Sequence, residues 1–207
     1  LKIKNRTALI VGASKNIGRS ISIALAKEKV SVIMVARSKE KLTKLKKEVD
    51  KYSTNNYIIQ MDLNIKSNIN KLNDEVNRKY KKIDIIIHNL GGSLGVKDPF
   101  SSSSKWLKVW NINLGYSIDI NNFFIPKMIL NKWGRIVHVS SAVTTSFDGY
   151  SPYASAKCAL EGYIKSVSKV VSKNNVIING IAPGVIDKKE GYFNHLKNNN
   201  ISELNKY

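Results

Sequence analysis

The sequence is poor in cysteine, with Cys158 alone among 207 residues. A disulfide bond within the chain is therefore excluded, which fits a reducing compartment. No apolar run approaches the ~20 residues that a transmembrane helix needs. The first residues, Leu1 to Arg6, lack the apolar stretch and the cleavage site of a secretory signal. We therefore expect a cytoplasmic protein with no membrane partner.

Acidic residues are also scarce, since 15 Asp and Glu stand against 34 Lys and Arg, a formal net charge of +19. The lysines are spread over the expected helices and the C-terminal segment, and they form no stripe interleaved with aromatic residues. This distribution is typical of solvated faces, so no specific nucleic-acid partner is predicted. Salt-sensitive nucleic-acid binding driven by charge alone is the alternative. Such a field also attracts phosphorylated cofactors and acidic substrates.

Histidine is limited to His88, His138 and His195. None of them has the spacing to Cys, Asp or Glu that is typical of metal ligands, so no metal site is predicted. His138 lies within an apolar run, which indicates a core residue rather than a catalyst.

Short runs rich in Ile and Val alternate with longer helical stretches. Most of the short runs are continuously apolar, as in parallel strands buried on both faces. The expected strands are Ala8–Val11, Val30–Ala36, Asn56–Met61, Ile83–Asn89, Arg135–Ser140 and Val176–Ile181. The expected helices are Ile17–Lys29, Lys39–Lys51, Asn68–Lys79, Lys105–Asn131 and Tyr153–Ser172, with a kink or break at Pro126. The alternation predicts one doubly wound α/β domain of the Rossmann type over residues 1–207, a parallel sheet flanked by helices.

A glycine-containing turn follows the first expected strand and precedes the first helix. Gly12 permits a tight turn, and Gly18 permits close packing of the helix. Backbone N–H groups of the turn and the positive end of the helix dipole suit a pyrophosphate. The predicted cofactor contacts of the turn are Gly12, Ser14, Lys15, Asn16, Ile17 and Gly18.

The second expected strand ends at Ala36 and Arg37, where NAD-binding versions of this architecture carry an acidic residue for the ribose hydroxyls. The missing carboxylate favours NADP (NADPH) over NAD. Arg37 can pair with a 2′-phosphate, and Lys15 supplies a second cation. The alternative is that both side chains are solvated basic residues.

Tyr153 and Lys157 are one helical turn apart and lie on the same side of their expected helix. A tyrosine hydroxyl has an ordinary pKa of ~10, and a nearby ammonium lowers that pKa. The tyrosine can then donate a proton to a carbonyl oxygen. The pair alone has little specificity in a lysine-rich chain. Ser140 and Ser141 strengthen it, because they end a strand at the edge where ligands bind in this architecture.

Taken together, these motifs resemble the short-chain dehydrogenase/reductase family from about Lys4 to Asp187. The resemblance implies catalytic roles for Ser141, Tyr153, Lys157 and Asn113. Besides the glycine turn and Arg37, it implies cofactor contacts for Asp62, Asn89, Gly91, Tyr153, Lys157, Pro183 and Gly184.

The resemblance also implies what each catalytic residue does. Tyr153 is the general acid in reduction, and Ser141 orients the substrate oxygen. Lys157 lowers the pKa of Tyr153 and holds the nicotinamide ribose. Asn113 supports a water molecule that relays protons.

Several positions depart from the family pattern. Asn16 replaces a glycine, and asparagine tolerates a left-handed backbone better than most residues. His88 and Leu90 flank Asn89 in place of Asn and Ala, and Asp187 stands where a threonine often contacts the carboxamide. The polar segment 184–207 corresponds to part of a substrate lid, so we expect that the family's last helix and strand are missing.

The predicted function is an NADP-dependent oxidoreductase that transfers hydride between the nicotinamide and a carbonyl or alcohol substrate. Resemblance to 3-oxoacyl-carrier-protein reductase-like members makes an acidic or carrier-bound substrate the default and implies a homodimer or homotetramer. The alternative is a catalytically silent, NADP-sensing regulator on the same fold.

Overall fold

All six expected strands form, and they pair in parallel in one sheet with the order β3-β2-β1-β4-β5-β6. The computed structural model describes residues 2–146, 150–184 and 186. The strands are β1 (Thr7–Val11), β2 (Ser31–Ala36), β3 (Tyr57–Gln60), β4 (Ile85–His88), β5 (Gly134–Val139) and β6 (Val176–Ile181). The prediction of a doubly wound, Rossmann-type sheet is therefore confirmed.

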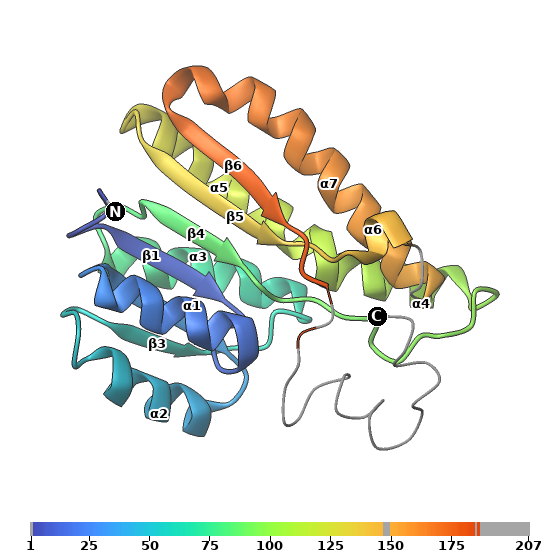
Figure 1. Cartoon of the computed structure of the whole chain (residues 1–207), viewed down its shortest axis with the longest axis horizontal. Coiled ribbons are helices and arrows are strands. Elements are labelled where there is room, and N and C mark those ends of the chain that lie inside the picture. Colours follow the sequence, from blue (N-terminus) through green and yellow to red (C-terminus); the bar gives the residue numbers. More distant parts are fainter. Residues whose placement is uncertain (1, 147–149, 185, 187–207) are drawn as a thin grey trace.

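Helices cover both faces of this sheet (Figure 1). They are α1 (Asn16–Lys27), α2 (Lys39–Val49), α3 (Lys66–Lys79), α4 (Ser103–Trp110), α5 (Tyr116–Leu130), α6 (Val143–Ser146) and α7 (Ser151–Val171). A π-helical turn, η1 (Asn111–Gly115), joins α4 to α5, and a 3-10 turn, η2 (Ser172–Asn174), follows α7. Within the described residues, no helix has the length and apolar character needed to cross a membrane.

Two hydrophobic cores lie on the two faces of the sheet. Leu9 and Val11 of β1 pack in one core with residues of α3, α5 and α7. Ala8 and Ile10 of the same strand pack in the other core with residues of α1 and α2. Alternate residues of a strand point to opposite faces, so a strand covered on both sides must be apolar throughout. This explains the continuous Ile- and Val-rich runs.

The long helical stretch before β5 differs from its expected form. It departs from α geometry at the π-helical turn η1, whereas α5 continues through Pro126. Pro126 lies on the exposed side of α5, as does Asn122 four residues before it. The backbone carbonyl that loses its partner at a helical proline is therefore on the side open to water, so the helix does not break there.

The central strands β1 and β4 are also linked by side chains at both ends. At one end Asp84, which is 3% exposed, accepts hydrogen bonds from Arg6 Nη1 and Thr7 N, each at 2.9 Å. At the other end Asn89 Nδ2 donates to the Gly12 carbonyl at 2.9 Å. These contacts fix the strands at the point where the strand order reverses, which is where ligands bind in open α/β sheets.

Candidate active site

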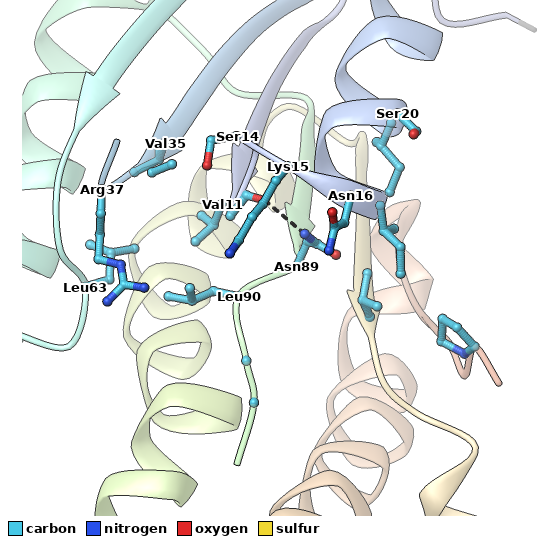
Figure 2. Close-up of a pocket in the computed structure, with 18 of the residues that line it drawn as sticks. Val11, Ser14, Lys15, Asn16, Ser20, Val35, Arg37, Leu63, Asn89 and Leu90 are labelled. Atoms are coloured by element: carbon cyan, nitrogen blue, oxygen red, sulfur yellow. Dashed lines mark hydrogen bonds between the residues drawn. The ribbon is translucent and has the colours of Figure 1, made fainter. Parts of the chain in front are cut away.

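A cleft of about 1370 Å³ runs along the carboxyl ends of the strands (Figure 2). It exceeds the ~300–1,000 Å³ of ordinary small-molecule pockets, so it suits an extended ligand. The sequence-predicted residues that line it are Gly12, Ser14, Lys15, Asn16, Ile17, Arg37, Asp62, Asn89, Gly91, Ser141, Tyr153, Lys157, Pro183 and Gly184. Gly18 and Asn113 do not line the cleft, but both contact residues that do. Asp187 and the rest of the expected lid, apart from Gly184 and Ile186, lie outside the described residues.

The glycine turn forms one wall. Gly12 has a φ of +80°, and a Cβ there would lie 3.0 Å from the backbone of Asn89. Asn16 adopts a φ of 57°, the left-handed backbone expected where asparagine replaces the glycine of the family pattern. A Cβ on Gly18 would lie 2.2 Å from the Gly12 carbonyl oxygen. Gly18 is therefore required for close packing of α1 against the turn.

The cleft beside this turn suits an anion. Helix α1 has no acidic residue in its first turn, so the positive end of its dipole is not neutralised. In Figure 2 the Lys15 and Arg37 side chains extend into the pocket from two different loops. The Asp62 carboxylate, on the same lining, accepts hydrogen bonds from Asn64 N at 3.0 Å and Asn64 Nδ2 at 2.8 Å. These residues fit a phosphorylated dinucleotide.

Sequence reasoning missed two lining residues next to Arg37. Ser38 caps helix α2 by accepting a hydrogen bond from Lys41 N at 3.3 Å, and Lys41 adds a third cation to the cleft. The signal was a serine followed by a helical stretch, which is typical of an N-cap. Lys41 lies three positions after this cap, so it is at the same end of α2 as Ser38.

Tyr153 and Ser141 lie together in the cleft. Burial raises the pKa of Tyr153, and the nearby Ser141 side chain lowers it to a smaller extent. The side chain of the neighbouring Ser140 instead bonds to Glu161 at 2.9 Å. Of the two serines, Ser141 is therefore the one placed beside the tyrosine hydroxyl.

Lys157 is 3% exposed, and its Nζ donates to the Val139 carbonyl at 2.7 Å. Burial lowers the pKa of Lys157 to about 8. Its Nζ is 5.8 Å from the centre of the Tyr153 ring. We expected this ammonium to lower the pKa of Tyr153. In this structure the ammonium is directed to a carbonyl, and the effect of burial on the tyrosine outweighs any lowering.

Asn113 holds the backbone next to these groups. Its Nδ2 donates to the carbonyls of Gly92 at 2.8 Å and Val109 at 2.7 Å, and its Oδ1 accepts from Gly92 N at 3.0 Å. A Cβ on Gly91 would lie 2.6 Å from Asn113 Oδ1 and 3.2 Å from Lys157 Nζ. A side chain at position 91 would therefore displace Asn113 Oδ1, which is held by its hydrogen bond from Gly92 N.

The two residues that flank Asn89 have separate roles. Leu90 lines the cleft. His88 is buried, and its Nε2 lies 2.9 Å from Asn121 Oδ1. Of these two departures from the family pattern, only Leu90 changes the pocket wall.

Comparisons with known proteins agree with this geometry. Residues 6–192 match the family described as short chain dehydrogenase. The chain is 31% identical to a 3-oxoacyl-[acyl-carrier-protein] reductase of Aquifex aeolicus, over 90% of this chain and 76% of that protein. It is 34% identical to an NADPH-dependent pterin aldehyde reductase of Arabidopsis thaliana, over 88% of this chain and 75% of that protein. A solved 3-oxoacyl (acyl-carrier-protein) reductase from Agrobacterium tumefaciens C58, with NADP bound, has a TM-score of 0.86 at 23% identity and covers 95% of this chain and 76% of that one.

The chain therefore belongs to the short chain dehydrogenase family. It is an NAD(P)-dependent oxidoreductase that acts on CH–OH or C=O groups.

Proposed function

We propose that the chain uses NADPH to reduce a carbonyl compound to an alcohol, or catalyses the reverse reaction, through Ser141, Tyr153 and Lys157. The observation that carries this proposal is that Ser141, Tyr153 and Lys157 line the same cleft, with Lys157 buried one helical turn from Tyr153. These are the groups that bind a carbonyl oxygen and give it a proton. The cleft has room for the cofactor beside them.

NADPH, when bound, supplies the hydride. Ser141 binds the substrate oxygen through its hydroxyl, and Tyr153 donates its proton to that oxygen. Burial raises the pKa of Tyr153, which favours the protonated hydroxyl that this step uses. The Lys157 ammonium, one turn along the helix, stabilises the phenolate that remains. Asn113 keeps the Gly91–Gly92 backbone in place beneath Lys157.

The preference for NADPH over NADH is the second part of the proposal. Lys15, Arg37 and Lys41 all line the cleft, and the position after β2 carries arginine instead of a carboxylate. An added phosphate gains charge-assisted hydrogen bonds from such groups, whereas a free ribose does not. The relative from Arabidopsis thaliana is named as NADPH-dependent, which supports the same choice.

Fluorescence titration with NADPH and NADH in matched salt tests the cofactor. We expect tighter binding of NADPH, and an Arg37→Asp change weakens that binding by roughly 10- to 100-fold, equivalent to about 1.4–2.8 kcal/mol. Arg78→Asp is the matched control, because Arg78 is exposed on α3 and the charge change is the same. Equal losses in the two variants would show that only the overall positive field acts on the nucleotide.

The same protein samples separate an enzyme from a cofactor sensor. Tyr153→Phe removes the proton donor and keeps the ring, so it is expected to reduce NADPH consumption by about 10²- to 10⁴-fold while NADPH still binds. A wild-type protein that binds NADPH but consumes none with any carbonyl would support the sensor.

We propose that the substrate is an acidic or carrier-bound acyl compound. We also propose that the protein is cytoplasmic and forms a homodimer or homotetramer. Relatives named as reductases of acyl groups on a carrier protein support the substrate class, and a charge of +19 attracts an acidic carrier. Leu107 and Trp110 on α4 are 59% and 36% exposed, an apolar pair that a second copy can cover. Light scattering measures the assembly, and turnover of a 3-oxoacyl thioester against a neutral polyol measures the substrate class.

A further inference from the structure

Three side chains occur at one-turn intervals along helix α7. Tyr153, Lys157 and Glu161 are spaced by four residues, so they follow one side of the helix. The first two belong to the proposed catalytic group. Glu161, one turn further on, is partly buried and does not line the cleft.

Glu161 contacts the segment that carries Ser141. Its Oε1 accepts hydrogen bonds from Ser140 Oγ at 2.9 Å and from Thr144 Oγ1 at 2.8 Å. Thr144 Oγ1 also lies 3.0 Å from the Ser141 carbonyl oxygen. One carboxylate oxygen therefore holds hydroxyls on both sides of Ser141 in the sequence.

The segment that Glu161 holds has little stability of its own. Helix α6 has four residues, far fewer than a helix needs to form without tertiary contacts. Ser141 Oγ accepts from Val143 N at 3.3 Å, a local contact that moves with the segment. A fixed position for Ser141 relative to Tyr153 therefore depends on links from this segment to α7.

We propose that Glu161 is a positioning residue for Ser141. Its carboxylate ties the turn from Ser140 to Thr144 to helix α7, so the Ser141 hydroxyl stays within reach of the Tyr153 hydroxyl. Because Tyr153 and Glu161 belong to one helix, a single rigid element sets the distance between the hydroxyls of Ser141 and Tyr153. This inference rests on the proposed roles of Ser141 and Tyr153.

Two substitutions separate hydrogen-bond acceptance from mere occupancy of the site. Glu161→Leu removes the acceptor, and Glu161→Gln keeps an Oε1 that accepts from both hydroxyls. Since a displacement of ~1 Å can cost ~100-fold in rate, we expect Glu161→Leu to lower kcat by about 10- to 100-fold. NADPH affinity should stay within about twofold, because Glu161 is outside the cleft. Glu161→Gln should retain kcat within about threefold.

Lys165→Leu is the matched control, since Lys165 lies one turn further along α7 and is exposed. It should leave kcat unchanged. A wild-type kcat in Glu161→Leu, or an equal loss in Glu161→Gln, would overturn the positioning role.

Amide hydrogen exchange gives a readout that needs no turnover. The amides of Thr144 and Thr145 donate to Ser141 and Ala142 carbonyls within the held segment. They should exchange faster in Glu161→Leu than in the wild type, while amides of β1 do not change. Unchanged exchange at residues 144–145, or equal acceleration in β1, would count against the inference. If the wild-type chain consumes no NADPH, the proposed function fails, and this measurement still decides whether Glu161 holds the Ser141 segment.

Discussion

His88, His138 and Lys157 are the buried side chains that can carry positive charge among the described residues. The two imidazole rings stack with centroids 4.4 Å apart, and the Asn121 amide lies between their Nε2 atoms, at 2.9 Å from His88 and 3.3 Å from His138. Burial lowers the pKa of His88 to about 4. For His138, burial lowers the pKa first, and repulsion from His88 and Lys157 lowers it further. Both rings are therefore neutral at neutral pH, which leaves Lys157 as the charged group of the three.

This arrangement predicts that stability falls in mild acid. The pKa of His88 in the folded protein lies below its ordinary value of 6.5. The unfolded chain therefore takes up this proton first as the pH falls. Its contribution to stability is intact above pH ~6.5 and is lost progressively toward pH ~4.

His88→Asn, which places the residue typical of the family there, removes the titrating group. Between pH 7 and pH 5, urea unfolding should show that the wild type loses about 2 kcal/mol more stability than this variant. Parallel losses in the two proteins would mean that His88 is not responsible.

The π-helical turn η1 is the element that joins the core to the active site. It interrupts the long helix at Asn111–Gly115 and contains Asn113, which spans from Val109 to both backbone groups of Gly92. Wider turns of this kind are frequent at functional sites. Here the turn directs one amide at the strand end that carries Gly91.

Asn113→Ala should weaken this connection. It leaves the Gly92 N–H and two carbonyls without their partner, so we expect a loss of about 2 kcal/mol in the free energy of unfolding. Asn111→Ala, on the exposed side of the same turn, should change it by less than about 0.5 kcal/mol. Thermal and urea unfolding of the two variants side by side check the difference. Similar losses would place the effect in helix propensity.

The sequence predicts strands better than it predicts irregular elements. Apolar runs, most of them continuous, locate all six strands, because burial on both faces of the central strands leaves a pattern that needs no knowledge of the partner strand. The turn at Asn111–Gly115 leaves no such pattern, since α and π turns present the same apolar residues to the core. Ser38 and Lys41 were missed because their place in the cleft depends on how β2 and α2 meet. Glu161 was missed because acceptance of two hydroxyl groups has no sequence spacing.

At the scale of the molecule, the sheet consists of two three-stranded halves, β1–β3 and β4–β6, joined where β1 pairs with β4. The glycine turn and Arg37 come from the first half. Ser141, Tyr153 and Lys157 come from the second. The sequence motifs indicate which strand ends carry ligand contacts, but the pairing of β1 with β4 is a long-range contact that local patterns do not contain.

This junction has a consequence for how the binding site is made. Gly12 and Asn89, which meet across it, are 77 positions apart in the sequence. Closing so long a segment is slow compared with forming local helices. During refolding from urea, the NADPH fluorescence signal should therefore recover after the helical circular dichroism signal. Simultaneous recovery would mean that the halves dock as fast as their helices form. On the ribosome, the first half emerges with its glycine turn and Arg37 but without Asn89 beneath them, so a growing chain acquires its nucleotide only after β4 has been synthesised.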